Sequence, residues 1–225
     1  MSMNIVSLFA GCGGLDLGFK LAGFNIVWAN EYDSTIWKTF EKNFPGTRLD
    51  KRSITDVFPS EIPDCMGIIG GPPCQSWSEA GAQRGLEDHR GQLFFDYVRV
   101  LKEKQPLFFL AENVSGILAP KHAEAFSSIL DSLSSAGYNV SYKLLNAKNF
   151  NVPQDRKRVI IVGFHESLET YFEFPKGEVV CPTLSDAIWG LPEPLPAKHN
   201  NKANSIDTLE LPNHEYMNGG FSTIY

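Results

Sequence analysis

The sequence predicts an α/β fold built on one mostly parallel sheet with helices on both faces. Short apolar runs rich in β-branched and aromatic residues alternate with segments of helical period, which is typical of βαβ units. Polar motifs adjoin several of the apolar runs, and open α/β sheets bind their ligands at strand ends. The 225 residues, 43% of them hydrophobic, suffice for one large domain with its own core.

The apolar runs predict six strands, at residues 4–9, 25–29, 66–70, 107–111, 138–145 and 159–164. Amphipathic spacing predicts helices at residues 15–22, 34–43, 93–104 and 123–136, with Gly137 placed to end the last one. Prolines become frequent after Phe174, at positions 175, 182, 192, 194 and 196. We therefore expect the main domain to span residues 1–174 and residues 175–225 to be a connecting segment.

The charge of the chain is acidic overall and basic locally. A formal net charge of -6 disfavours nucleic-acid binding, because phosphate neutralisation requires clustered Lys and Arg. One short stretch is nevertheless basic and contains Lys143, Lys148, Arg156, Lys157 and Arg158, with only Asp155 opposing them. This stretch predicts either a positive rim on the acidic body or an ordinary solvated face.

The cysteines and the apolar runs limit the possible environments. Four cysteines without paired spacing indicate reduced thiols and no metal site. No apolar run approaches the roughly 18 residues that cross a bilayer, and the N-terminus does not have the pattern of a signal peptide. We expect a cytoplasmic protein without membrane contacts.

A glycine-rich turn between the first strand and the first helix predicts a ligand site. Glycines at 11, 13 and 14 let a ligand approach the backbone and the helix N-terminus. The second strand ends at Glu31, where a carboxylate can accept hydrogen bonds from ribose hydroxyls. Tyr32 follows, and it either contacts the ligand or packs in the core.

Three further motifs offer a nucleophile, an acid and a pair of cations. Residues 71–76 (GPPCQS) follow one strand, Glu112 and Asn113 follow another, and residues 154–158 (QDRKR) precede a third. Two prolines before Cys74 and a polar loop after it are atypical of a buried cysteine. Cys12, Cys65 and Cys181 show no such setting, and we interpret them as small core residues.

Together these residues resemble the cytosine-5 DNA methyltransferases, in the family's order from about residue 4 to about residue 165. The resemblance implies a Rossmann-like methyltransferase domain over residues 1–174 and S-adenosyl-L-methionine as cofactor. The glycine spacing indeed departs from that of a dinucleotide site. The implied cofactor residues are Phe9, Ala10, Gly11, Gly13, Gly14, Leu15, Glu31, Tyr32, Ser53, Ile54 and Pro72.

Ser53 is a departure from the family pattern, which commonly has an acidic residue at this position to contact the adenine amine. Ser53 itself, Asp50 and Asp56 are the alternatives for that contact. The resemblance also implies that Glu31 holds the ribose and that Tyr32 stacks on adenine.

The resemblance assigns catalysis to Cys74, Glu112, Arg156 and Arg158. Cys74 would add to cytosine C6 as a thiolate, Glu112 would act at N3, and the arginines would hold O2 and the phosphate. Asn113 would orient the loop. A loop after Cys74 would close over a flipped-out cytosine, with DNA contacts from Gln75, Ser76, Ser78, Gln83, Arg84 and Arg90.

Duplex DNA is the implied partner, in a restriction-modification context. Residues 75–79 and 212–216 are similar to stretches of bacterial enzymes that modify GGCC. The family's target-recognition region and last two motifs do not follow, so we expect either a fragment or a partner polypeptide that supplies them. An RNA cytosine-5 methyltransferase, a subunit without turnover and a cysteine hydrolase are the alternatives.

Overall fold

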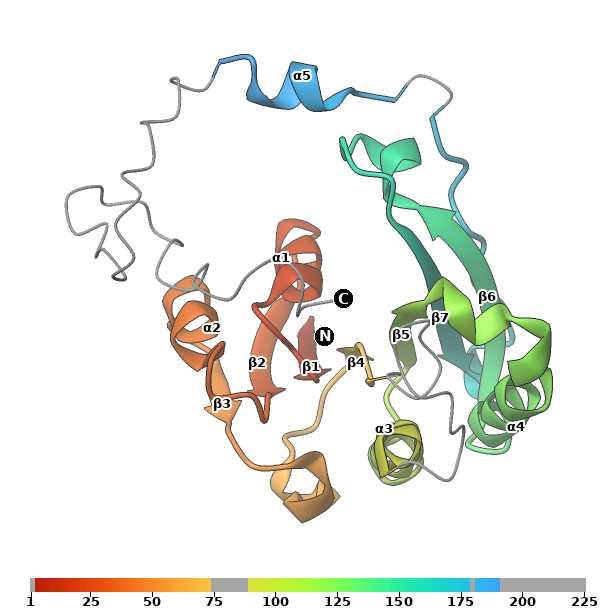
Figure 1. Cartoon of the computed structure of the whole chain (residues 1–225). Helices are drawn as coiled ribbons and strands as arrows, with labels where there is room; N and C mark the ends of the chain where they lie inside the picture. The colour runs from red at the N-terminus through yellow and green to blue at the C-terminus, as the bar shows by residue number, and fades with distance from the viewer. Residues whose placement is uncertain (1–2, 74–88, 179–180, 191–225) are drawn as a thin grey trace.

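A seven-stranded sheet with strand order β3-β2-β1-β4-β5-β7-β6 forms the centre of the molecule (Figure 1). The computed structural model describes residues 3–73, 89–178 and 181–190. The strands are β1 (Asn4–Leu8), β2 (Asn25–Asn30), β3 (Arg48–Asp50), β4 (Gly67–Gly70), β5 (Phe108–Val114), β6 (Tyr138–Asn146) and β7 (Lys157–His165).

Five strands, from β3 to β5 across the sheet, are parallel, whereas β7 and β6 are antiparallel to their neighbours. The first residues of β7 therefore lie at the edge of the sheet where the parallel strands end. The pairs Gly70↔Ala111 and Val114↔Arg158 mark this edge. The prediction of a mostly parallel α/β sheet is confirmed, and the antiparallel pair is an addition to it.

Helices cover both faces of the sheet, as predicted. They are α1 (Gly14–Leu21), α2 (Trp37–Asn43), α3 (His89–Lys104), α4 (Ala123–Ser134) and the short α5 (Leu184–Ile188). Short 3-10 helices are η1 (Ile54–Asp56), η2 (Pro59–Glu61), η4 (Ser115–Leu118), η5 (Pro120–His122), η6 (Ala147–Phe150) and η7 (Glu166–Leu168). Aromatic residues of α1 and α2 pack on one face, and those of α3 and α4 pack on the other.

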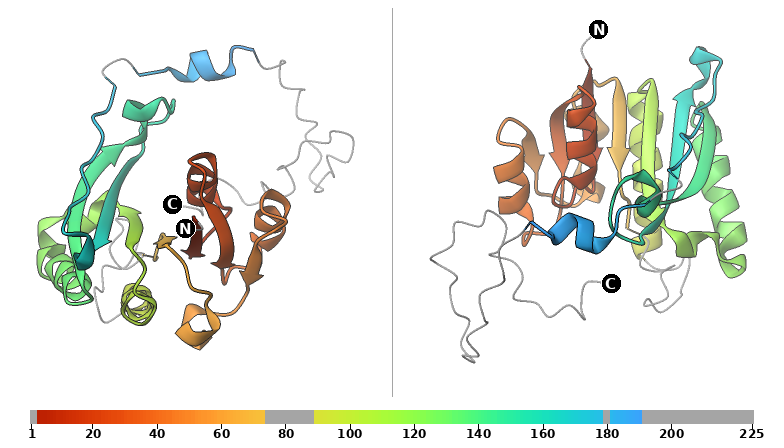
Figure 2. Two further views of the ribbon diagram at one scale, coloured as in Figure 1. Left: turned by 180° about the vertical axis from the view of Figure 1, so that it is seen from behind. Right: turned by 90° about the horizontal axis from the view of Figure 1, so that it is seen from above.

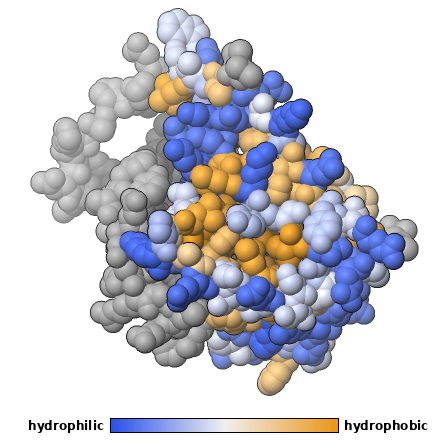
Figure 3. Space-filling view, turned by 90° about the vertical axis from the view of Figure 1, so that its right-hand side faces the viewer, coloured by the Kyte–Doolittle hydropathy of each residue, from blue (hydrophilic) through white to orange (hydrophobic). Residues whose placement is uncertain are grey.

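The central strands are buried on both faces, which explains their continuous apolar sequences. Ile5 and Ile69 contact the layer of α1 and α2, while Val6 and Ile68 contact the layer of α3 and α4, and all four are 0% exposed. The edge strand β6 differs, since Tyr142 and Leu144 are exposed. Viewed from the side of β6 and α4, hydrophobic residues gather near the middle with hydrophilic ones around them (Figure 3).

All six predicted strands and four predicted helices are present, with shifted ends. The strand β3 was missed, because three residues containing Arg48 and Asp50 carry no apolar pattern. The predicted helix 34–43 begins only at Trp37, since the Asp33 side chain holds the preceding residues in a turn by accepting from Thr35 N. Gly137 follows α4 with a φ of +94°, and its N–H donates to the carbonyl of Ser134.

The chain leaves β7 and runs to α5, which lies away from the sheet (Figures 1 and 2). Leu184, Ile188 and Trp189 are exposed there. The division into a domain of residues 1–174 and a connecting segment of residues 175–225 stays a prediction. None of the described helices is long and apolar enough to cross a membrane.

Candidate active site

Two of the three polar motifs meet at the edge where β4 and β5 end and β7 begins. Glu112 belongs to β5 and Arg158 to β7, and the antiparallel pairing of these strands brings both side chains to one place. Arg158 Nε lies 2.8 Å from Glu112 Oε1, and Arg156 Nη2 lies 4.0 Å from the same oxygen. All three side chains are partly exposed, so the group can meet a ligand from solvent.

The GPPCQS motif approaches Glu112 from β4. A β-carbon placed on Gly71 would lie 3.5 Å from Glu112 Oε2, so the second carboxylate oxygen faces the start of this motif. Buried Asn113 donates from Nδ2 to the carbonyl of Pro72 at 3.4 Å, and its role in orienting the loop stays a prediction. The residues that lead to Cys74 are therefore tied to β5.

The predicted nucleophile and most predicted DNA contacts lie outside the described residues. These are Cys74, Gln75, Ser76, Ser78, Gln83 and Arg84. Arg90 belongs to the first turn of α3, and its side chain is also outside the described part. Their assigned roles stay predictions.

The glycine-rich turn has the backbone that close ligand approach requires. Gly11 and Gly13 have φ values of +56° and +85°, and Phe9 is also in the left-handed region at +54°. A side chain on Gly13 would overlap the ring of Phe44, whereas the space over Gly11 and Gly14 is open. The turn is thus fixed on one side and accessible on the other.

Glu31 connects this turn to the end of β2. Its Oε2 accepts from Gly11 N at 2.8 Å, and its Oε1 accepts from Asp33 N at 2.8 Å. A carboxylate has about four acceptor positions, so each oxygen can still accept a ligand hydroxyl. The open glycines beside this carboxylate fit a nucleoside-containing cofactor such as S-adenosylmethionine.

The other cofactor candidates divide into exposed and buried side chains. Tyr32 is 73% exposed, so the interpretation of it as a core residue is wrong. Ala10 donates its N–H to the carbonyl of Asn30, which places it beside β2. Ile54 and Pro72 are buried, and Leu15 is half-buried against the core beneath α1.

The three alternatives at Ser53 also differ in their contacts. Ser53 caps η1, and its Oγ accepts from Thr55 Oγ1 at 2.8 Å. The carboxylate of Asp50 is engaged by Arg52 through Nε and Nη2, whereas the side chain of Asp56 is exposed. The structure therefore disfavours Asp50 as a free acceptor.

Asp16 and Arg52 are charged residues of this region that the sequence motifs do not predict. Asp16, in the first turn of α1, is 0% exposed, and burial raises its pKa to about 6, opposed in part by the nearby hydroxyl of Ser7. Neither carboxylate oxygen has a well-formed hydrogen bond among the described residues. The signal for Asp16 is an acid between the apolar positions 15 and 19, while nothing in the sequence distinguishes Arg52 from an ordinary surface cation.

No group of His, Cys, Asp and Glu side chains in the described part of the chain is arranged to hold a metal ion.

The chain is similar in sequence to known DNA methyltransferases. The family model for C-5 cytosine-specific DNA methylase matches residues 3–223. Type II methyltransferase M.MthTI of Methanothermobacter thermautotrophicus is 56% identical over 225 residues, covering 100% of this chain and 68% of that protein. Type II methyltransferase M.NgoPII of Neisseria gonorrhoeae is 53% identical, covering 99% and 66%.

Solved structures agree in fold. A putative DNA modification methyltransferase encoded within an E. coli prophage superposes with a TM-score of 0.76 at 32% identity, covering 86% of this chain and 56% of that one. Spodoptera frugiperda DNMT2, at 24% identity and a TM-score of 0.65, shares the fold. The chain spans about two thirds of the length of these curated relatives and just over half of these solved chains. It belongs to the C-5 cytosine-specific DNA methylase family.

Proposed function

We propose that the protein is a DNA cytosine-5 methyltransferase of restriction-modification type. It transfers a methyl group from S-adenosylmethionine to C5 of a flipped-out cytosine in duplex DNA. The observation that carries this proposal is Glu112, held by Arg158 at the sheet edge and facing Gly71 three residues before Cys74.

The chemistry requires electron density to be pushed into the cytosine ring, because C5 is a poor nucleophile. The Cys74 thiolate forms a bond to C6, and a proton donated by Glu112 at N3 makes C5 nucleophilic. S-adenosylmethionine, the cofactor of this family, supplies an electrophilic methyl group when bound. Once C5 carries the methyl group, loss of the C5 proton restores the double bond between C5 and C6 and expels the thiolate, and the N3 proton returns to Glu112.

The arginines position and stabilise these groups. Arg158 orients Glu112 through its 2.8 Å contact, so that the other carboxylate oxygen is directed to the side of Gly71. The positive charges of Arg158 and Arg156 favour the thiolate form of a nearby cysteine. The guanidinium groups also donate hydrogen bonds to the cytosine O2 and to a phosphate.

The cofactor is held at the neighbouring strand ends. The methionine part of the cofactor lies against the open backbone at Gly11 and Gly14, and Glu31 accepts hydrogen bonds from the cofactor's ribose. Tyr32, whose ring is exposed, stacks on the adenine. Phe9, Ala10, Gly13, Leu15, Ser53, Ile54 and Pro72 complete the pocket.

Duplex DNA approaches the same edge, where Gln75, Ser76, Ser78, Gln83, Arg84 and Arg90 contact it. The family's target-recognition region, for which a second polypeptide is the proposed source, sets which site is modified, because bases are read in the grooves.

A trapping assay tests the proposed chemistry. The chain is incubated with S-adenosylmethionine and a duplex carrying 5-fluorocytosine in GGCC, and the denatured protein is analysed by mass spectrometry. Because fluorine at C5 blocks the elimination, we expect a stable adduct on Cys74 that Cys74→Ser abolishes. The absence of an adduct, both alone and with the C-terminal portion of a relative added, would refute the proposal. An adduct on RNA alone would reassign the substrate.

The same assay separates the two arginines. Arg158→Lys removes the forked donor nearest Glu112 and should slow trapping by about 100-fold, whereas Arg156→Lys should slow it by about tenfold or less. Equal losses would contradict the assignment of Arg158 as the residue that orients Glu112.

A further inference from the structure

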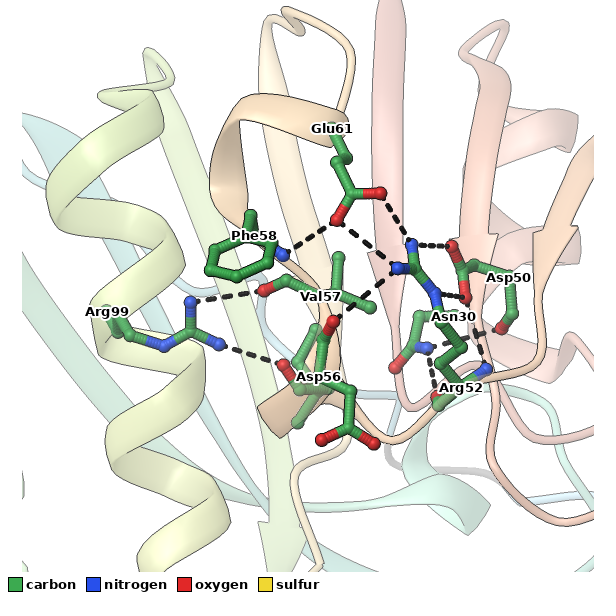
Figure 4. Close-up of polar contacts among 9 residues, drawn as sticks. Asn30, Asp50, Arg52, Asp56, Val57, Phe58, Glu61 and Arg99 are labelled. Carbon is green, nitrogen blue, oxygen red and sulfur yellow. Dashed lines mark hydrogen bonds and ion pairs between the residues drawn. The ribbon is translucent and has the colours of Figure 1, made fainter.

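An ion cluster beside the proposed cofactor pocket is not part of the described chemistry. Arg52 contacts Asp50 through Nε at 3.0 Å and Nη2 at 2.7 Å, and it contacts Glu61 through Nη2 at 3.1 Å and Nη1 at 3.3 Å. Arg52 thus joins the end of β3 to η2 across the intervening turn (Figure 4). Its guanidinium lowers the pKa of both Asp50 and Glu61.

The cluster is connected by hydrogen bonds to Glu31. The carbonyl of Asp50 accepts from Glu31 N at 3.0 Å and from Asn30 Nδ2 at 3.2 Å. Asn30 Nδ2 also donates to the carbonyl of Arg52 at 2.8 Å. A change in the position of residues 50–52 is therefore transmitted directly to the backbone of the proposed ribose-binding residue.

A second arginine holds the other side of the same turn. Arg99, on α3, donates from Nη2 to the carbonyl of Ile54 at 2.8 Å and from Nη1 to that of Val57 at 3.2 Å. The side chains of Ile54 and Val57 are buried in the core. The turn that contains Ser53 is thus held on one side by the core and by Arg99 of α3. Arg52 holds it on the other side.

The arrangement does more than an isolated surface ion pair. The pair with Glu61 is exposed on both sides and contributes little to the free energy of unfolding, whereas the Asp50 side chain is only 6% exposed and loses its cation without Arg52. Holding a pocket wall in place before the ligand arrives, in contrast, lowers the ordering cost of binding. The expected consequence of losing Arg52 is therefore a loss of binding larger than its modest loss of stability explains.

We infer that Arg52 is a positioning residue for cofactor binding, which acts by fixing residues 50–57 against Glu31 through Asp50 and Glu61. This inference rests on the proposed function, because it assumes that the pocket beside Glu31 takes S-adenosylmethionine. Arg52 does not itself contact the cofactor in this role.

Titration calorimetry with S-adenosylhomocysteine, compared with the thermal unfolding midpoint, tests the inference. Arg52→Met should raise the dissociation constant by about five- to tenfold and leave the midpoint within a few degrees of the wild type. Lys104→Met is the control. Lys104 is likewise ion-paired, to Asp64 at 2.6 Å, but this pair lies outside residues 50–57.

A milder variant guards against misfolding. Glu61→Gln keeps the contact between Arg52 and Asp50 and should weaken binding by about threefold. Arg52→Lys should recover part of the affinity, because an ammonium can still bridge the two acids but not as a fork.

The outcomes separate the two proposals. Wild-type affinity in Arg52→Met and Glu61→Gln, or equal weakening in Lys104→Met, would overturn the role of Arg52 and leave the proposed function intact. A wild-type protein that bound no S-adenosylhomocysteine would overturn the cofactor assignment and the inference together.

Discussion

Asp16 is the residue whose chemistry conflicts most with its surroundings. It is fully buried beneath α1, opposite Ser7 of β1, and the Ser7 hydroxyl likewise has no well-formed hydrogen bond among the described residues. Burying an ionised carboxylate without partners costs free energy, so the proton is retained to higher pH. The first turn of α1, which follows the glycine-rich turn, therefore contains a buried carboxyl group, that of Asp16, with a pKa of about 6.

The free energy of unfolding should depend on pH through Asp16. Its folded-state pKa of about 6 lies above its ordinary value of 3.8, so the folded state binds the proton more tightly and stability falls as pH rises from 4 to above 6. The difference corresponds to about 3 kcal/mol. Asp16→Asn should restore much of the lost free energy of unfolding at pH 8 and little at pH 4. Urea unfolding of both proteins at the two pH values measures the difference.

The exposed Asp131 of α4 gives the control for this prediction. Asp131→Asn should shift the unfolding curves by a similar small amount at pH 4 and pH 8. A gain in Asp16→Asn that is the same at both pH values would show that Asp16 is not the titrating group.

At the scale of elements, two glycines in the connection between β1 and α1, Gly13 and Gly14, have different surroundings. Gly13 has a φ of +85° and lies against Phe44, whereas Gly14 begins the helix with open space above it. Gly13 is thus required by the fold, whereas Gly14, with open space above it, is the position we propose for contact with the ligand.

Alanine at these two positions should separate folding from binding. Gly13→Ala imposes left-handed strain and overlap with Phe44, and it should lower the free energy of unfolding by about 2–4 kcal/mol. Gly14→Ala should change it by less than about 1 kcal/mol while weakening the binding of S-adenosylhomocysteine. Chemical denaturation and calorimetry on both variants measure this, and equal destabilisation would contradict the assignment.

The reversed direction of β7 is the element-scale feature that completes the candidate site. A parallel strand in the same position would begin at the opposite edge of the sheet and carry its arginines away from Glu112. The pairing of Asn113 with Val159 and of Val114 with Arg158 fixes this register. A slip by one residue would turn Arg158 to the other face.

At the scale of the whole molecule, an acidic chain presents basic residues where the site opens. The net charge is -6, yet Arg156, Lys157 and Arg158 lie at the start of β7, and Lys148 in the adjoining η6 pairs with Asp155 at 3.2 Å. The local positive charge can attract phosphates despite the total. Arg156 and Arg158 also pair with Glu112, so the positive rim stays a prediction beside that of an ordinary solvated face.

Salt dependence of DNA binding tests the positive rim. Lys157 is exposed, and Lys157→Gln should weaken duplex binding for all sequences and reduce the slope of log K against log salt by about 1. Lys102→Gln, in the last turn of α3, should leave the slope unchanged. Fluorescence anisotropy with labelled duplex, at salt concentrations from about 50 to 300 mM, measures the slope for each variant. Equal slopes in the two variants would show that the DNA does not bind at the start of β7.

The sequence by itself determined the fold class, six of the seven strands and the identity of the polar motifs. It could do so because strand burial, helical period and turn glycines are local properties, recorded by residues near one another in the chain. Glu31 and Glu112 were found in this way, as acids directly after apolar runs. The sequence does not decide whether Tyr32 packs in the core or contacts a ligand, because an aromatic residue at a strand end carries no local signal for exposure.

Only the tertiary structure decided which distant groups share a site. The contact of Arg158 with Glu112 depends on the antiparallel direction of β7, and the engagement of Asp50 by Arg52 depends on how the turn folds back toward η2. The burial of Asp16 depends on the packing of α1 on β1. Direction, return path and packing are set by the sum of weak contacts over the whole sheet, and no single segment of the sequence carries them.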